Sequence, residues 1–149
     1  MHTLDSCRIE KAYRHFGHDI TDEDHVLEAG LGFAVKVDKG DFFGRDAVLT
    51  KKEEGLSKVL LQFCLLDPAA MMFHNEPILR NGVIVGYISS ANYGHHLGAA
   101  VGLGYVPCFQ EDILDVLSSK YEIEIAGKLF EAKVSAKAMY DPKSLNVRI

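Results

Sequence analysis

The spacing of hydrophobic positions changes near residue 55 of this 149-residue chain. Before that point, apolar side chains recur at intervals of three and four residues, which is the period of a helix with one buried face. This spacing predicts a helix over residues 5–16, capped by Asp5 or Ser6 and ended by Gly17. The side chains on its predicted inner face are Ile9, Ala12, Tyr13 and Phe16.

The remainder of the first part carries one strand signal and one helix signal. Residues 32–37 place apolar side chains at every second position, which predicts a strand. After a loop that contains glycine, residues 45–54 predict a second helix. We expect this helix to turn Ala47 and Val48 inward and to end at Gly55.

From about residue 56 the chain consists of short alternating segments separated by turn residues. The clearest turn is Asn81-Gly82, because both residues tolerate the positive φ angles of a type I′ hairpin. A second turn is predicted at Ala126-Gly127. Gly102 and Gly104 alternate with larger residues, so another segment can approach that strand closely. The predicted strands are 58–66, 76–80, 83–88, 99–106, 121–125 and 129–138.

These patterns predict two units. Residues 1–55 form a helix–strand–helix part, and residues 56–149 form a small antiparallel barrel or sandwich. The fold class predicted for the whole chain is therefore α+β, with the helices first and the all-β module second.

Composition and charge exclude several classes of partner. The net charge of −5 argues against a nucleic-acid partner, which needs clustered Lys and Arg. No apolar run approaches the roughly 20 residues that span a bilayer, so we expect no membrane partner. Three widely spaced cysteines fit a reducing compartment better than a disulfide scaffold. Cys64 lies in an apolar run and is predicted to be a small buried hydrophobe.

No constellation of metal-binding or catalytic residues stands out in the sequence. His15 and His18 are three positions apart and His95 adjoins His96, but no cysteine lies near either pair. A zinc site needs three or four converging ligands. We therefore predict no metal site and assign no catalytic residue.

Three segments in fixed order carry a family resemblance: RIEKAYRHFGHDI at 8–20, LEAGL at 27–31 and KGDFFGRDAVL at 39–49. They resemble the folate-dependent aminomethyltransferases, which include the glycine cleavage system T protein and the C-terminal regions of dimethylglycine and sarcosine dehydrogenases. The resemblance continues to the C-terminus. It implies the end of an α+β folate-binding domain in residues 1–55 and the family's compact β-barrel domain in residues 56–149.

The resemblance implies a role in one-carbon transfer from a small amine to tetrahydrofolate. In this family the catalytic aspartate lies in an upstream segment, and the dehydrogenase relatives, to which the segments are closer, carry an upstream FAD domain. Neither is present in these residues. We therefore expect the chain to work with a missing upstream domain of the same protein and to be inactive alone. The expected compartment is the cytoplasm in a bacterium and the mitochondrial matrix in a eukaryote.

The resemblance assigns folate binding to two residues. Arg8 stands at the position of the family's folate-binding arginine, whose guanidinium can hold a carboxylate or a pterin edge with paired donors. Phe16 replaces a Tyr or Trp near the pterin, so stacking is kept and a hydroxyl is lost. The residues alone leave open that Arg8 is solvated or pairs with Asp5 or Glu10, and that Phe16 packs in the core.

Two further features give expectations about local structure. Ser-Ser-Ala at residues 89–91 stands where the family has a T-S-G loop, and alanine lacks the backbone freedom of glycine. The role implied for this loop is to dock the barrel against the folate-binding domain. Glu10 and Arg14 are four residues apart, which predicts a surface ion pair on the first helix.

A non-catalytic regulatory or interaction module is the alternative function. The family includes a regulatory subunit of pyruvate dehydrogenase phosphatase with a similar C-terminal layout. An intact catalytic aspartate and flavin fingerprint upstream would favour the enzyme, and their degeneration would favour the regulator.

Overall fold

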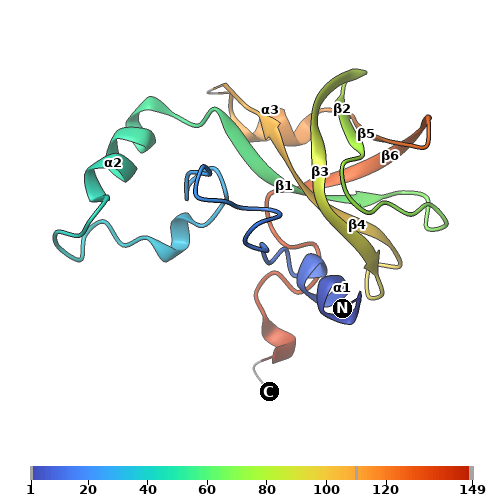
Figure 1. Cartoon of the computed structure of the whole chain (residues 1–149), viewed down its shortest axis with the longest axis horizontal. Coiled ribbons are helices and arrows are strands. Elements are labelled where there is room, and N and C mark those ends of the chain that lie inside the picture. The colour runs from blue at the N-terminus through green and yellow to red at the C-terminus, as the bar shows by residue number, and fades with distance from the viewer. Residues whose placement is uncertain (1, 110, 148–149) are drawn as a thin grey trace.

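The computed structural model describes residues 2–109 and 111–147, and its central feature is a closed antiparallel barrel (Figure 1). Neighbouring strands follow the order β1-β4-β3-β2-β5-β6 around the barrel. The predicted fold class is confirmed, and each predicted strand after residue 56 is present. The strands are β1 (Lys58–Leu65), β2 (Pro77–Arg80), β3 (Val83–Gly94), β4 (Ala99–Pro107), β5 (Tyr121–Ile125) and β6 (Lys128–Ser135).

Two tight turns connect strands that are consecutive in the chain. Asn81 and Gly82 have φ angles of 52° and 82°, as a type I′ turn between β2 and β3 requires. Ala126 and Gly127 have φ angles of 50° and 75° between β5 and β6. Both predicted hairpins are therefore confirmed, because local turn chemistry determines them.

The barrel interior is filled by large apolar side chains and closed by a helix that the sequence patterns did not predict. This helix is α3 (Ile113–Ser118), and the Asp112 side chain caps it by accepting from the Leu114 amide. Val116 of α3 is buried in the core, and its carbonyl accepts from the Tyr121 hydroxyl at 3.0 Å. Other core residues are Phe63, Met72, Ile78, Ile88, Val106 and Ile123.

The glycines of β4 allow close packing, as predicted. A Cβ atom on Gly104 would lie 2.7 Å from the Tyr87 carbonyl oxygen and 2.6 Å from Ile78 Cδ1. A Cβ atom on Gly102 would lie 3.0 Å from Ala91 Cβ. These distances are shorter than ordinary contacts, so β3 and β4 can pair here only because the side chains are absent.

The first helix is shorter than predicted. It is α1 (His2–Glu10), so it begins before Asp5 and ends well before Gly17. Ala12 has a φ angle of 52°, and the predicted inner-face residues Tyr13 and Phe16 are 57% and 70% exposed.

A buried amide from the barrel explains why the helix ends early. The Gln62 side chain in β1 donates to the carbonyl oxygens of Ile9 and Glu10 at 2.7 and 3.2 Å. A partner outside the helix thus satisfies these C-terminal carbonyl groups. Only Ile9 and Ala12 of the predicted apolar stripe are buried. The helical spacing of apolar residues therefore continues to Phe16, although contacts with the barrel end the helix at Glu10.

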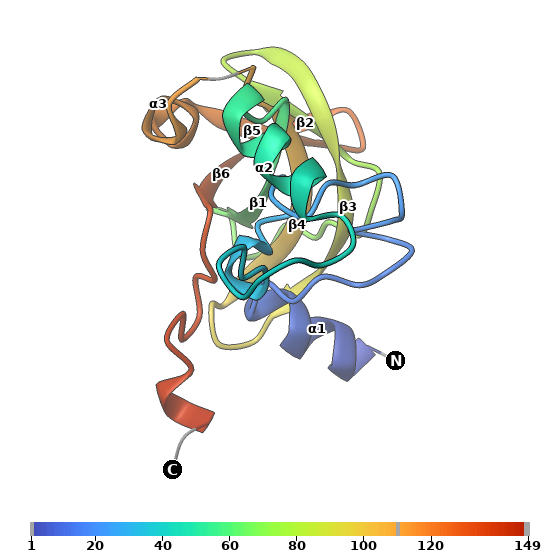
Figure 2. The same cartoon turned by 90° about the vertical axis from the view of Figure 1, so that its left-hand side faces the viewer.

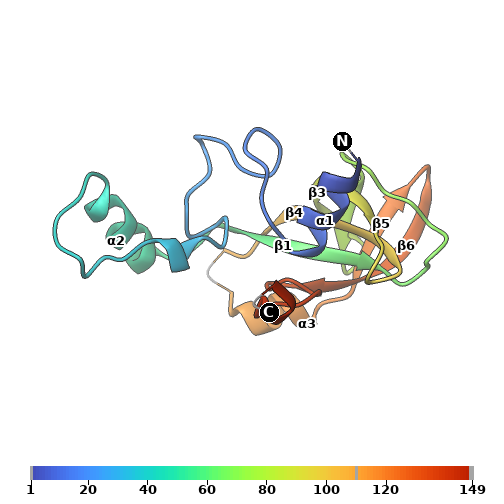
Figure 3. The same cartoon turned by 90° about the horizontal axis from the view of Figure 1, so that it is seen from below.

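Residues 31–55, which include α2, extend away from the barrel as an arm (Figures 1 and 3), and Figure 2 views this arm from its far end. The predicted strand at 32–37 is wrong, because residues Gly32–Ala34 form a short 3-10 helix and Phe33 is 81% exposed. Helix α2 (Arg45–Glu54) is confirmed, with Gly55 after it, but none of its residues is buried. Of the two residues predicted to turn inward, Ala47 is exposed and Val48 is only half-buried. No helix in the described part of the chain is long and apolar enough to cross a bilayer.

Glu28 fastens the arm to the barrel. Its carboxylate accepts from the Ser57 amide at 3.1 Å and from the Ser57 hydroxyl at 2.7 Å, and it pairs with Lys51 of α2 at 3.1 Å. Its backbone carbonyl accepts from the Leu60 amide of β1. Burial disfavours the charged carboxylate, but these hydrogen bonds outweigh burial and lower the pKa of Glu28 to about 2.

The lowered pKa predicts acid sensitivity. A carboxyl group with a depressed folded-state pKa contributes stability that is present above its ordinary value of 4.5 and is lost as the pH falls towards 2. Wild type should therefore exceed Glu28→Gln in unfolding free energy by at most about 3 kcal/mol at pH 7, and this advantage should shrink between pH 4.5 and 2. Urea unfolding across this range measures it. Glu53→Gln, at an exposed position of α2, is the control, and a constant gap for Glu28→Gln would contradict the assignment.

The close approach at Gly104 predicts a packing penalty. Gly104→Ala should destabilise the barrel by about 1–3 kcal/mol, because the new methyl group meets a backbone oxygen that cannot move independently of β3. Gly32→Ala is the matched control, since its Cβ would meet only the flexible end of Leu27 at 3.2 Å. Equal melting temperatures for the two variants would show that β3 and β4 separate without cost.

Candidate functional site

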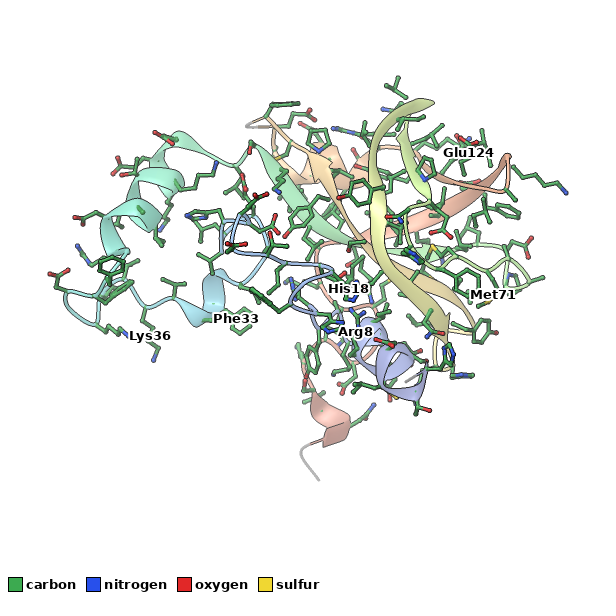
Figure 4. The ribbon with its side chains drawn as sticks, in the orientation of Figure 1. Arg8, His18, Phe33, Lys36, Met71 and Glu124 are labelled. Carbon is green, nitrogen blue, oxygen red and sulfur yellow. The ribbon has the colours of Figure 1, made fainter. Side chains whose placement is uncertain are left out.

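Arg8 lies in the last turn of α1, where the helix faces β3 (Figure 4). Its side chain is 12% exposed. Nη1 donates to Asp19 Oδ2 at 2.5 Å and to Ser90 Oγ at 3.0 Å, and Nε donates to Asp5 Oδ1 at 3.3 Å. The local pairing with Asp5 that the sequence left open is therefore present, but the shortest contact is with Asp19. Arg8 is neither solvated nor paired with Glu10.

Asp19 is the centre of this cluster. Its side chain is fully buried, and Oδ1 accepts from the hydroxyls of Ser89 and Ser90 at 2.5 and 2.6 Å. Oδ2 accepts from Arg8 and from the His15 amide at 2.9 Å. Four donors from three parts of the chain thus compensate one buried carboxylate, which would otherwise be strongly unfavourable.

Ser89 and Ser90 lie within strand β3, so the predicted loop at residues 89–91 is wrong. Neighbouring side chains of a regular strand point to opposite faces. Here the pairing register of β3 with β4 shifts between Ile88 and Ser90, which is a bulge. The bulge lets two consecutive hydroxyls reach the same carboxylate.

The predicted ion pair between Glu10 and Arg14 is wrong. The Glu10 carboxylate is buried and accepts from the amides of His96 and Leu97 at 2.7 and 3.0 Å. Arg14 donates instead to the carbonyl oxygens of Ala29 and Ala12 at 2.9 and 2.7 Å. Because the helix ends at Glu10, the two residues no longer share one helical face.

Arg8 and Phe16, the two residues that the resemblance assigns to folate binding, form no hydrogen bond or cation–π contact with each other. Nη2 of Arg8 donates to none of the described residues, so one edge of the guanidinium keeps free donors. The Phe16 ring is exposed, and its backbone forms an isolated bridge with Ile20. The alternative that Phe16 packs in the core is therefore wrong.

A cavity of about 900 Å³ lies beside this segment, between residues 11–33 and the C-terminal tail after β6. Its lining includes four cationic side chains, exposed aromatic rings and, among the described residues, no carboxylate, although the chain as a whole is acidic. Two lining residues connect it with the cluster above: Tyr13, whose carbonyl accepts from Arg8, and Ile20, which bridges to Phe16. The cations are Lys11, Arg14, Lys137 and Lys143, and the rings are Tyr13 and Phe33.

The four cations differ in how they are engaged. Lys11 pairs with Asp141 at 3.1 Å, and Arg14 is bonded to carbonyl oxygens, with burial lowering its pKa from the usual value. Lys137 and Lys143 are exposed and form no ion pair within the described residues. The cavity therefore offers an excess of positive charge next to apolar rings, which suits an anionic ligand with a flat apolar body.

A second cavity of about 570 Å³ lies where residues 18–24 meet the barrel, and it shares no lining residue with the first. Its one lysine, Lys58, is neutralised by Asp24 at 2.6 Å and lies 4.4 Å from the centre of the Tyr105 ring. Burial, followed by the charge of Asp24, raises the pKa of Tyr105 well above its usual value. This cavity is thus unsuited to an anion.

No group of three or more His, Cys, Asp or Glu side chains among residues 2–109 and 111–147 is arranged to hold a metal ion. Cys64 is buried, as predicted, and burial raises the pKa of its thiol. Sequence reasoning missed that Asp19 is buried beside Arg8 and that Lys137 and Lys143 line the larger cavity. Asp19 had a signal, since it lies inside the first quoted segment. Lys137 and Lys143 had no sequence signal, because their position depends on the path of the C-terminal tail after β6.

Comparisons with known proteins agree with this architecture. The glycine cleavage T-protein C-terminal barrel domain matches residues 58–141, and the GCVT N-terminal domain matches residues 1–39. The predicted boundary after residue 55 lies between these ranges and stays a prediction.

Two relatives illustrate the range of named activities. A 4-methylaminobutanoate oxidase (formaldehyde-forming) of Paenarthrobacter nicotinovorans is 40% identical over 99% of this chain and 17% of its own length. An aminomethyltransferase of Halothermothrix orenii is 43% identical over 68% of this chain and 28% of its own length. Other relatives are the human mitochondrial sarcosine dehydrogenase and the mouse pyruvate dehydrogenase phosphatase regulatory subunit. The chain therefore spans only a small part of the curated relatives that it matches.

A solved structure supports the fold. The glycine cleavage system aminomethyltransferase T from Bartonella henselae superposes with a TM-score of 0.78 at 23% identity, over 93% of this chain and 38% of that one. The barrel-domain match alone covers more than half of the chain. This chain therefore belongs to the family of glycine cleavage T-protein C-terminal barrel domains, the C-terminal region shared by aminomethyltransferases and sarcosine dehydrogenase-like proteins.

Proposed function

We propose that this chain is the C-terminal portion of a tetrahydrofolate-dependent aminomethyltransferase or dimethylglycine/sarcosine dehydrogenase-like enzyme, and that it helps to bind folate for one-carbon transfer from an amine. The observation that carries this proposal is the cavity with four cations, aromatic rings and no carboxylate. Tetrahydrofolate combines a flat pterin and an aminobenzoyl ring with the carboxylates of a glutamate tail. Its chemistry therefore complements that lining.

Arg8 and Phe16 are the two proposed folate-binding residues outside this lining. Four contacts through Nε and Nη1 hold the Arg8 guanidinium, while Nη2 is left for a ligand. Phe16 presents an exposed ring next to Ile20, which lines the cavity. A ring held at the surface of a folded segment is available for stacking.

The chemistry itself is proposed to lie outside this chain. The family resemblance puts the catalytic aspartate and, in the dehydrogenase branch, the FAD domain in upstream segments. The residues seen here would bind, orient and shield the folate rather than transfer protons. We propose that the complete protein acts in the cytoplasm of a bacterium or in the mitochondrial matrix of a eukaryote.

The second candidate is a non-catalytic regulatory module of the same family. It is favoured by the relative named as a pyruvate dehydrogenase phosphatase regulatory subunit, which is 39% identical over 89% of this chain. Upstream sequence discriminates between the two: an intact aspartate segment and flavin fingerprint support the enzyme.

Removing the guanidinium should weaken folate binding. In the protein that includes the upstream domain, Arg8→Ala should raise the dissociation constant of tetrahydrofolate by an amount equivalent to about 1.5–3 kcal/mol, the range for a hydrogen bond to a charged group. Isothermal calorimetry measures it. An unchanged constant would remove Arg8 from the site.

The cavity lysines should contribute through charge. In the same protein, the double variant Lys137→Ala/Lys143→Ala should bind tetrahydrofolate more weakly and with less dependence on salt, because two exposed cations are removed from the lining. The matched control is Lys52→Ala/Lys128→Ala, which changes the net charge equally at exposed positions outside the cavity. Equal affinities of the two double variants would argue against this cavity.

The isolated chain should bind folate weakly or undetectably by calorimetry, because most of the proposed pocket belongs to the upstream domain. Micromolar affinity in this assay would show instead that residues 1–149 hold the main contacts.

A further inference from the structure

Ser89 and Ser90 both bind Asp19, but they differ in what else they contact. The Ser90 hydroxyl donates to Asp19 Oδ1 at 2.6 Å and accepts from Arg8 Nη1 at 3.0 Å. The Ser89 hydroxyl donates to Asp19 at 2.5 Å and has no contact with Arg8. Two adjacent serines thus share one buried carboxylate, and only one of them touches the guanidinium.

We infer that Asp19 and Ser90 are positioning residues for Arg8, through which the barrel determines the orientation of the guanidinium edge that faces a ligand. This inference rests on the proposed function of Arg8. Asp19 approaches Nη1 from residues 15–20, and Ser90 approaches it from β3. Contacts from two separate parts of the chain define the plane of the guanidinium, which one ion pair would leave free to rotate.

Asp5 alone would not achieve this orientation. Its carboxylate is 37% exposed and lies one turn from Arg8 on the same helix, with a distance of 3.3 Å to Nε. Such an exposed pair on one helix contributes little to side-chain order. The fully buried Asp19, held by four donors, cannot move away from Nη1 without losing hydrogen bonds.

Fixing the side chain before ligand binding has an energetic consequence. A mobile arginine side chain loses considerable rotamer entropy when a ligand immobilises it. A guanidinium that is already held in one orientation loses less entropy on binding. If folding has already ordered Arg8, a ligand that meets Nη2 gains the hydrogen bond without that loss. The bulge at residues 88–90 contributes to this arrangement, because in a regular strand Ser89 and Ser90 would point to opposite faces and only one of them could reach Asp19.

The test compares Ser90→Ala with Ser89→Ala. Each variant removes one hydrogen bond to Asp19, so both should lower the melting temperature by similar amounts. Only Ser90→Ala should increase the mobility of the Arg8 side chain. In the ligand-free chain, we expect the Nε–Hε resonance of Arg8 to stay rigid on the nanosecond timescale in wild type and Ser89→Ala and to become mobile in Ser90→Ala, as measured by NMR relaxation.

A third variant, Asp5→Asn, should leave the resonance rigid, because Asp5 is the exposed partner. Equal mobility of Arg8 in Ser89→Ala and Ser90→Ala would overturn the inference, since the serines would then act only on overall stability. The comparison uses no substitution of Asp19, whose loss would disturb folding.

A ligand titration separates this inference from the proposed function. With 5-formyltetrahydrofolate added to the labelled chain at millimolar concentration, Ser90→Ala should bind about three- to tenfold more weakly than Ser89→Ala. Equal affinities would count against positioning. If the probe shifts no resonance even in wild type, folate binding requires the upstream domain, as expected for the isolated chain, and the proposed function is then tested by Arg8→Ala in the longer protein. The mobility of Arg8 in the isolated chain still decides whether Asp19 and Ser90 position it.

Discussion

The buried carboxylate of Asp19 is the interaction on which the arrangement of this molecule depends. A charge with no exposed surface is tolerated only when donors surround it, and here these come from α1, from the His15 backbone and from two hydroxyls of β3. If the N-terminal segment separated from the barrel, the Asp19 carboxylate would lose the hydrogen bonds that compensate its charge. This single site makes α1 and strand β3 parts of one structure, although Arg8 and Ser90 are 82 residues apart in the chain.

Buried polar groups make the other attachments as well. Gln62 joins the end of α1 to the C-terminal tail by donating to Ile9 and accepting from the Met139 amide at 2.7 Å. Glu10 holds the turn between β3 and β4, and Glu28 holds the arm. Directional bonds of this kind specify one geometry more strictly than apolar contact does. The arm, with no buried residue in α2, has few other contacts and should be the least protected region in hydrogen exchange.

The proposed ligand site follows from the same attachments. The tail that Gln62 and Lys11 hold in place carries Lys137 and Lys143, which line the larger cavity and form no ion pair among residues 2–109 and 111–147. The segment held by Asp19 carries Arg8 and Phe16. Both walls are therefore positioned by contacts with the barrel, which itself supplies little of the lining. A barrel domain in this family can thus support a site that lies mostly outside it.

The sequence by itself determined the barrel strands, both tight hairpins, the glycine contacts of β4 and the family, because period-2 alternation, turn chemistry and ordered motifs are local signals. It did not determine where α1 stops or that residues 32–37 avoid a strand, since Gln62 ends the helix and no sheet edge is available to the arm. It offered Asp5 as a partner of Arg8 but not Asp19 or Ser90. Asp19, Ser89 and Ser90 meet only after the barrel closes and β3 bulges, and contacts between distant parts of a chain leave no periodic trace in the sequence.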